Sequence, residues 1–185
     1  MALKLNLIAA VCENMGMGKN NNLPWRLKTE MAYFTEMTSK TLSDKKQNVV
    51  IMGRKTWDSI PSKFKPLPNR INFVLSRSDL DLNQYKDTYS FKSFDEMFDK
   101  LNNDKFRELY EKIWVIGGSH IYKMCLDNKY FHRLYLTEIK KTYDCDIFFP
   151  QLSDKFIEVE DSEVPSGIQE EDDVQFVYKV FETKK

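Results

Sequence analysis

The chain has few of the residues that build metal centres or disulfide frameworks. Its three cysteines are an odd number, lie far apart and form no CxxC motif, and its two histidines have no metal-ligand spacing. We therefore expect reduced thiols, no zinc site and an intracellular compartment. The cysteines are Cys12, Cys125 and Cys145, and the histidines are His120 and His132.

Long apolar runs and a net charge are also missing. No apolar stretch approaches the roughly 20 residues that span a bilayer. The N-terminal segment up to Val11 lacks the charged region and cleavage pattern of a signal peptide. We therefore expect a cytoplasmic protein without a membrane partner. The 28 basic and 28 acidic residues cancel, which argues against a general role in nucleic-acid binding.

What the sequence does contain is an alternation of strand and helix patterns along its whole length. This predicts an α/β fold: a single domain over residues 1–185, with a mostly parallel central sheet of about eight strands, about four flanking helices and a C-terminal antiparallel hairpin. Residues 13–24 are expected to be a loop, and the acidic stretch 158–173 is expected to be a solvated hairpin connection. The expected strands are 4–11, 48–52, 70–75, 89–91, 113–116, 134–139, 156–160 and 174–181, and the expected helices are 28–39, 54–60, 94–101 and 119–126.

One carboxylate, Glu30, falls on a helix face where apolar residues recur. An ionised carboxylate on a buried face costs several kcal/mol unless something pairs with it, and no Lys or Arg lies one turn away on that face. Burial also raises a carboxyl pKa toward neutrality, which suits proton chemistry. A partly solvated carboxylate near the positive end of the helix is the alternative. The other residues of this face are Leu27, Met31, Phe34, Met37 and Thr38.

Three turns that follow predicted strands have the composition of phosphate sites. One contains the pair Gly117-Gly118 before a helix, one contains Arg54-Lys55-Thr56, and one contains Ser76-Arg77. Taken alone, each could be a simple tight turn or an exposed cationic surface. In open α/β sheets, however, ligands bind at the carboxyl ends of the strands. Together with Glu30, the three turns predict one cleft for a dinucleotide and a nitrogen-rich second substrate.

Many short motifs occur in one particular order between Leu5 and about Phe181. They are Ile8-Ala9-Ala10, Gly16-Met17-Gly18-Lys19, Leu23-Pro24-Trp25, Glu30, Val50-Ile51-Met52-Gly53-Arg54-Lys55-Thr56-Trp57, Ser59-Ile60-Pro61, Pro66-Leu67, Arg70-Ile71-Asn72, Leu75-Ser76-Arg77, Gly117-Gly118, Ile121-Tyr122, Thr137 and Phe148-Phe149-Pro150. In this order and spacing, the chain resembles the dihydrofolate reductases of the eukaryotic type.

The resemblance implies an enzyme that transfers a hydride from NADPH to C6 of 7,8-dihydrofolate and protonates N5. The product is 5,6,7,8-tetrahydrofolate, which supports one-carbon metabolism and thymidylate synthesis. The resemblance also implies a cytoplasmic monomer that methotrexate and other antifolates inhibit, with no obligatory nucleic-acid partner. Because the chain ends at Lys185, no thymidylate synthase domain is expected to follow. Two alternatives are a sister pyridine-nucleotide reductase of another heterocycle and a non-catalytic pterin-binding or RNA-binding protein.

Catalytic and substrate-binding roles follow from the same resemblance. Glu30 would accept hydrogen bonds from the ring N3–H and the 2-amino group of the pterin. Thr137 would support Glu30, Trp25 would position an ordered water, and Arg70 would bind the glutamate α-carboxylate. Leu23 is the remaining catalytic residue. The other substrate-binding residues would be Ile8, Ala10, Met31, Phe34, Ile60, Phe64, Leu67, Ile116 and Tyr122.

For NADPH, the resemblance places the 2′-phosphate among Arg54, Ser76, Arg77 and Lys92. The loop 13–23 would close over the nicotinamide and exclude water. The Gly117–Gly118 peptide bond is expected to be cis, and no metal ion is expected. The other cofactor-binding residues would be Ala10, Met17, Gly18, Lys19, Gly53, Lys55, Thr56, Leu75, Gly117, Gly118, Ser119, His120, Ile121 and Tyr122.

Some positions depart from the vertebrate pattern of this family. The segment Trp25-Arg26-Leu27 lacks a proline pair and is one residue shorter before Glu30. Met31 replaces an aromatic residue, which predicts a more adaptable pocket. Phe64 stands where a polar residue often contacts the aminobenzoyl amide.

Overall fold

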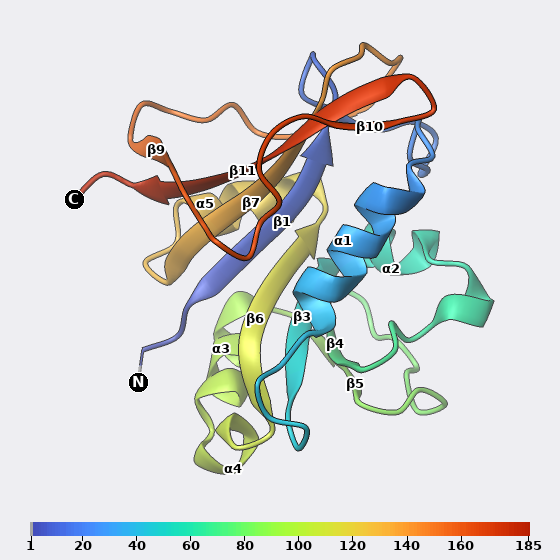
Figure 1. Cartoon of the computed structure of the whole chain (residues 1–185). Helices are drawn as coiled ribbons and strands as arrows, with labels where there is room; N and C mark the ends of the chain where they lie inside the picture. The colour runs from blue at the N-terminus through green and yellow to red at the C-terminus, as the bar shows by residue number, and fades with distance from the viewer. Residues whose placement is uncertain (1) are drawn as a thin grey trace.

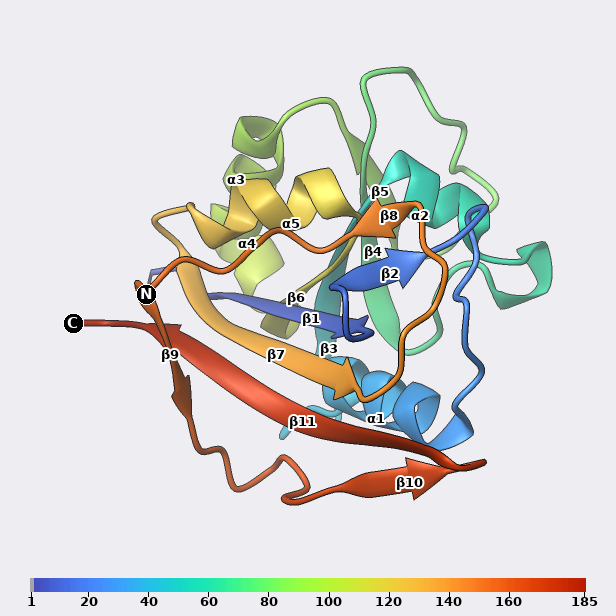
Figure 2. The same ribbon diagram turned by 90° about the horizontal axis from the view of Figure 1, so that it is seen from above.

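The computed structural model describes residues 2–185, which form a large twisted sheet with helices on both faces (Figure 1). Figure 2 shows α1 on one side of the sheet and α3 and α5 on the other. The strands are β1 (Leu5–Val11), β2 (Gly16–Gly18), β3 (Gln47–Gly53), β4 (Arg70–Leu75), β5 (Thr88–Phe91), β6 (Tyr110–Gly117), β7 (Phe131–Ile139), β8 (Ile147–Phe148), β9 (Phe156–Val159), β10 (Gln169–Glu171) and β11 (Val174–Thr183). The helices are α1 (Lys28–Ser39), α2 (Arg54–Ser59), the 3-10 helix η1 (Ser62–Phe64), α3 (Phe94–Asn102), α4 (Asp104–Arg107) and α5 (Ser119–Leu126).

The sheet is parallel over most of its width. Strands β7, β1, β6, β3, β4 and β5 lie side by side in that order, and each neighbouring pair is parallel. Strand β11 joins the β7 edge in antiparallel orientation, and both β9 and β10 pair with β11. The predicted α/β fold, with a mostly parallel sheet and an antiparallel C-terminal end, is confirmed.

Buried strands separate two apolar cores, one on each face of the sheet. In β3, Val49 and Ile51 belong to one core, whereas Val50 and Met52 belong to the other. Successive side chains of a strand point to opposite faces, so a continuous apolar run fits a strand that is covered on both sides. Helices α3 and α5 pack on the first core, while α1 and α2 pack on the second.

The sequence prediction missed several short elements. Residues 13–24 contain β2, which pairs with β8, and residues 158–173 contain β10, which forms a tight hairpin with β11. The prediction of about four helices also omitted α4 and η1 within residues 2–185. Strands of two or three residues and helices of one turn are too short to show a periodicity, so only tertiary pairing reveals them.

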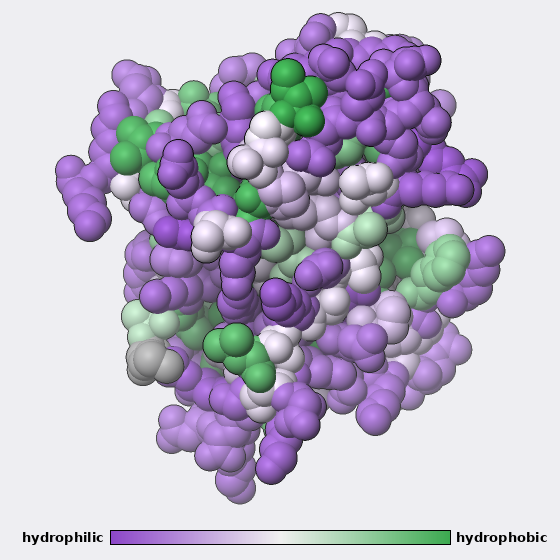
Figure 3. All heavy atoms as spheres, in the orientation of Figure 1, coloured by the Kyte–Doolittle hydropathy of each residue, from purple (hydrophilic) through white to green (hydrophobic). Residues whose placement is uncertain are grey.

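The surface of the face shown in Figure 1 is mainly hydrophilic, and its exposed apolar side chains lie in separate groups (Figure 3). Such scattered apolar residues are ordinary for a folded chain. Over residues 2–185, no helix combines the length and the hydropathy needed to cross a membrane.

Candidate active site

A large cavity opens at the carboxyl ends of the central parallel strands. Its volume is about 1740 Å³, and its wall includes residues from the second half of β1, from α1 and from the ends of β3, β4 and β6. The predicted site residues on this wall are Ile8, Ala10, Met17, Gly18, Leu23, Glu30, Met31, Phe34, Gly53, Arg54, Lys55, Thr56, Ile60, Phe64, Leu67, Arg70, Leu75, Ser76, Arg77, Lys92, Ile116, Gly117, Gly118, Ser119, His120, Ile121 and Tyr122.

Three predicted site residues do not line the cavity: Lys19, Trp25 and Thr137. Lys19 forms an ion pair of 3.2 Å with Asp144. Trp25 is buried against Tyr143, with ring centroids 5.5 Å apart, and its indole N–H has no partner among the described residues. Thr137 lies behind Glu30, as described below.

Several residues of the cavity wall were not predicted. Ile147 reaches it through the pairing of β8 with β2, and no local sequence pattern indicates that contact. Thr35 could have been found, because it lies four residues after Met31 on the same helix. The other residues missed are Ala9, Asn21, Asn22, Asp58, Ser59, Pro61, Pro68, Ser78, Ser93, Phe94, Asp95 and Met124.

Glu30 is a buried carboxylate, with only 6% of its surface exposed. The hydroxyl of Thr137 donates a hydrogen bond of 3.1 Å to its Oε1. Burial raises the pKa of Glu30, and the smaller effect of the Thr137 hydrogen bond lowers it. The alternative of a partly solvated carboxylate at the helix start is therefore wrong for this structure, because β7 covers the side chain with Thr137.

The apolar face predicted around Glu30 differs in part from the structure. Leu27 and Thr38 are buried, but Met31 is 47% exposed and lines the cavity. Within α1, the fully buried residues are Glu30 and Thr38, which are both polar. Apolar residues at helical spacing can therefore line a cavity or pack in the core, and their periodicity does not distinguish the two.

Arg70 is a buried cation with neutral partners. Only 4% of its surface is exposed, and its Nε and Nη1 donate hydrogen bonds of 2.9 Å to the carbonyl of Pro68 and the hydroxyl of Thr38. Burial lowers the pKa of Arg70 to about 10. Within residues 2–185 it forms no ion pair, so its charge can serve an anion that enters the cavity.

Tyr122 connects α5 to β1 beneath the cavity. Its hydroxyl donates a hydrogen bond of 2.7 Å to the carbonyl of Ile8. Burial raises the pKa of Tyr122, so the phenol is neutral and acts as a donor. A carbonyl oxygen has a second lone pair, so Ile8 can still accept a hydrogen bond from a ligand.

A glycine turn joins β6 to α5. The Gly117–Gly118 peptide bond is cis, as expected, and Gly117 has a φ of 131°. A Cβ atom on Gly117 would lie 3.4 Å from Oγ1 of Thr56 and 3.5 Å from the hydroxyl of Tyr122. No side chain caps the start of α5. Ser119 and His120 of its first turn line the cavity, and the N–H groups of an uncapped helix start are suited to bind phosphate.

Three cationic side chains line the part of the cavity next to the glycine turn: Arg54, Arg77 and Lys92. Arg54 donates a hydrogen bond of 2.7 Å to Ser78, and Lys92 forms an ion pair of 2.9 Å with Asp79. Arg77 is exposed and has no hydrogen-bond or ion-pair partner in the described part of the chain. This region therefore offers a free guanidinium to an anionic group.

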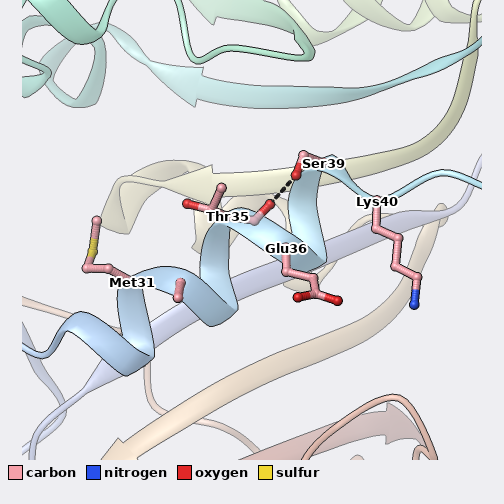
Figure 4. A pocket seen from close by; sticks show the side chains of 6 residues that line it. Met31, Thr35, Glu36, Ser39 and Lys40 are labelled. Atoms are coloured by element: carbon pink, nitrogen blue, oxygen red, sulfur yellow. Dashed lines mark hydrogen bonds between the residues drawn. The ribbon is translucent and has the colours of Figure 1, made fainter. Parts of the chain in front are cut away.

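A shallower hollow of about 710 Å³ continues from the cavity mouth along α1 (Figure 4). Met31 and Thr35 line both spaces, and the hollow ends near Lys40. In Figure 4, Ser39 donates its hydroxyl hydrogen bond back to the carbonyl of Thr35. This hydrogen bond stays within α1. Through Met31 and Thr35, the hollow adjoins the cavity.

One cavity brings together a buried carboxylate, a buried guanidinium without an ion pair and a glycine turn near the unpaired Arg77. This combination suits a dinucleotide and a small second substrate. The dihydrofolate reductase family model matches residues 4–182, and the chain belongs to this family.

Known relatives match along nearly the whole chain. The dihydrofolate reductase of Heliothis virescens is 44% identical over 182 residues, covering 97% of both chains. That of Gallus gallus is 42% identical over 181 residues, covering 96% of this chain and 95% of the relative. The solved structure of Schistosoma mansoni dihydrofolate reductase superposes with a TM-score of 0.85 at 34% identity and covers 100% of both chains.

Proposed function

We propose that this chain reduces 7,8-dihydrofolate to 5,6,7,8-tetrahydrofolate with NADPH. The observation that carries this proposal is that Glu30 and Arg70 line one cavity, both buried and neither paired with an opposite charge in residues 2–185. A carboxylate suits the adjacent N–H donors of a pterin, and a guanidinium suits the carboxylate of a glutamate tail. A substrate with both features explains why two costly buried charges face the same space.

Glu30 would hold the pterin through its ring N3–H and 2-amino group. The hydroxyl of Thr137 donates a hydrogen bond to Oε1 of Glu30, which restrains the carboxylate before the ligand binds. Ile8 and Ile116 would offer backbone carbonyls to the same ring. The apolar residues that would enclose the pterin and aminobenzoyl groups are Met31, Phe34, Ile60, Phe64 and Leu67.

The proton for N5 would reach the pterin through solvent rather than directly from Glu30. The indole N–H of Trp25 is buried without a partner in the described residues, and a buried donor of this kind fits a bound water. Burial raises the pKa of Glu30, so the free site takes up a proton at a higher pH than an exposed glutamate does. Leu23 lies on the cavity wall and would limit access of bulk water.

NADPH, when bound, supplies the hydride that reduces C6. The glycine turn fits its pyrophosphate, because Gly117 and Gly118 present backbone without a Cβ atom at the open start of α5. Lys55 and Thr56 would complete this part of the site. Arg77 would bind the 2′-phosphate together with the other polar residues of its wall, Arg54, Ser76 and Lys92.

The segment 13–23 would act as the lid of the site. Met17, Gly18 and Leu23 line the cavity, and β2 within this segment pairs with β8. Lys19 would join the cofactor contacts if the lid moves, since its present partner is the exposed Asp144. A closed lid excludes water from a hydride transfer.

We further propose a cytoplasmic monomer that antifolates such as methotrexate inhibit by occupying the pterin site. The support for the cytoplasm is the free state of Cys12, Cys125 and Cys145, because unpaired thiols are typical of reducing compartments.

The test is the oxidation of NADPH in the presence of 7,8-dihydrofolate, repeated with NADH and with methotrexate. We expect rapid turnover that methotrexate blocks and that prefers NADPH over NADH. Tight NADPH binding without turnover of dihydrofolate would contradict the substrate assignment and leave the cofactor assignment standing.

A further inference from the structure

Helix α1 carries Glu30, but apolar burial alone does not hold this helix in place. Its fully buried residues are Glu30 and Thr38, while Tyr33, Phe34 and Met37 are only partly buried against the sheet. A surface helix is usually positioned by a broad apolar stripe. The position of α1 therefore depends strongly on hydrogen bonds at its two ends.

Side chains of the parallel sheet hold the last turn of α1. The amide of Asn48, on β3, donates hydrogen bonds of 3.0 Å to the carbonyls of Thr38 and Lys40. Arg70, on β4, donates to the hydroxyl of Thr38. Carbonyl groups at a helix end need such partners, and these contacts fix the C-terminal end of α1.

The first turn of α1 is held by a residue from the other end of the chain. Leu27 occupies the N-cap position and makes no side-chain capping bond. Instead, the carboxylate of Glu171 accepts hydrogen bonds of 2.7 Å from the backbone N–H groups of Lys28 and Thr29, one to each oxygen. These two residues directly precede Glu30.

The charge of Glu171 suits this position. The N–H of Thr29 lowers the pKa of Glu171, with smaller contributions from the Thr29 side chain and the N–H of Lys28. The carboxylate is therefore ionised at neutral pH, and a negative charge is favourable at the positive end of a helix. An interaction that replaces a missing N-cap is expected to order the first turn.

The place of Glu171 is itself determined by β11. Glu171 is the last residue of β10 and pairs with Val174, across a turn beside the start of α1 (Figure 1 and Figure 2). Further along β11, Tyr178 pairs with Thr137, the residue that donates to the Glu30 carboxylate. Strand β11 thus pairs with both residues that contact this region: Glu171, which binds the backbone just before Glu30, and Thr137, which binds the Glu30 side chain.

We infer that Glu171 is a positioning residue, which fixes the first turn of α1 and so the place at which Glu30 meets the pterin. This inference rests on the proposed function for the identity of the ligand. Loss of the contact frees the backbone on which Glu30 stands and weakens pterin binding. Cofactor binding is spared, because the cofactor residues come mainly from the turns after β3, β4 and β6.

The test compares Glu171→Gln with two matched controls. Glu170→Gln removes the same charge from the neighbouring exposed position of β10. Glu111→Gln weakens the same type of contact elsewhere, since Glu111 accepts hydrogen bonds of 2.8 Å from the N–H groups of Leu42 and Ser43. Dissociation constants for dihydrofolate and for NADPH are measured separately by calorimetry on each variant, and wild-type turnover is measured alongside.

We expect Glu171→Gln to raise the dissociation constant of dihydrofolate about fivefold, the factor equivalent to the roughly 1 kcal/mol that a disrupted helix cap costs in stability. The dissociation constant of NADPH should be unchanged. Both controls should keep wild-type values for both ligands, although Glu111→Gln lowers thermal stability. An unchanged dihydrofolate constant in Glu171→Gln, or an equal rise in both constants, overturns the inference.

A second readout does not depend on the ligand. The N–H of Met31 donates to the carbonyl of Leu27 at 3.0 Å and reports on the first turn of α1. In the ligand-free chain, Glu171→Gln should speed amide exchange at Met31, and Glu170→Gln should not. Unchanged exchange at Met31 overturns the inference even if wild-type turnover of dihydrofolate is absent, in which case the proposed function fails separately.

Discussion

Thr137 donates its hydroxyl hydrogen bond to Oε1 of Glu30 at 3.1 Å, across 107 positions of sequence. The donor stands on β7 and the acceptor on α1, so the bond joins a strand of the parallel sheet to the helix that covers it. It satisfies one oxygen of a buried carboxylate that also lines the cavity. The remaining acceptor capacity of Glu30 can then be directed at a ligand.

Replacing Glu30 with Gln should separate catalysis from folding. The amide keeps the shape of the side chain but cannot accept two pterin donors, so turnover of dihydrofolate should fall about 100-fold. The affinity for NADPH should stay within about twofold, because Glu30 is not among the residues that would hold the cofactor. Steady-state kinetics and cofactor titration check this, and full activity in Glu30→Gln would remove Glu30 from the mechanism.

The same variant predicts a pH dependence of stability in the ligand-free chain. Burial raises the pKa of Glu30 in the folded state, so folded Glu30 keeps its proton at pH values where the unfolded chain has lost it. The stabilising contribution of protonated Glu30 is complete below the unfolded pKa, about 4.3, and is lost as the pH rises through the folded pKa.

Urea unfolding of Glu30→Gln and wild type from pH 4 to 8 measures this directly. The stability of Glu30→Gln relative to wild type should increase with pH and then level off, since all other titrating groups are common to both. Thr137→Val removes the hydrogen bond that lowers the pKa of Glu30. In that variant, the loss of stability with rising pH should therefore continue to a higher pH than in wild type. A difference that does not change with pH would mean that burial does not shift Glu30.

Much of the fold was predictable, because long elements carry their own patterns. The range of α1 and that of β4 were predicted as the structure shows them, and the apolar run of β3 indicated a strand covered on both faces. In contrast, β10 has three residues and an acidic composition that is typical of a loop. Strand β10 forms because it can pair with the edge of β11, and a local sequence pattern does not predict such a pairing.

In the site, too, some residues could be predicted from a local pattern and others could not. Glu30 was found because a charge in an apolar stripe violates a local rule, and such violations tend to mark functional positions. The role that we assign to Glu171 was not visible in the sequence, where it is one of several acidic residues before β11. Its contact joins segments about 142 residues apart, and only the folded chain brings them together.

Arg70→Gln should affect ligands that carry a carboxylate tail. The guanidinium has neutral protein partners, so its charge is available to the glutamate, and its loss should weaken dihydrofolate binding about 30-fold. A pterin without the glutamate tail is the matched control and should bind within about twofold of wild type. Calorimetry with both ligands checks this, and equal losses for the two would indicate a general disturbance of α1 instead.

Gly117→Ala should weaken NADPH binding more than a surface glycine substitution with similar backbone strain. Gly117 has a φ of 131°, and its Cβ would stand 3.4 Å from Oγ1 of Thr56 at the cavity wall. We expect a loss of NADPH affinity of about tenfold or more, because relief of the strain would displace backbone that faces the pyrophosphate. Gly167→Ala is the control, because Gly167 has a φ of 79° and nothing within 4 Å of its Cβ position.

Fluorescence titration with NADPH compares the two alanine variants. Gly167→Ala should bind the cofactor as wild type does, even where its unfolding temperature falls. If both variants bind NADPH normally, the glycine turn does not contact the pyrophosphate.

Arg77→Gln should change the choice between NADPH and NADH. Arg77 lies on the cavity wall, is exposed and has no hydrogen-bond or ion-pair partner elsewhere in residues 2–185, so its loss breaks no internal contact. An arginine binds a phosphate through paired hydrogen bonds worth about 1.5–3 kcal/mol, and the KM for NADPH should rise about tenfold. NADH lacks the 2′-phosphate and serves as the internal control, so its KM should be unchanged. A parallel rise for both cofactors would place Arg77 near the shared pyrophosphate, whereas no change for either would leave the 2′-phosphate to Arg54 and Lys92.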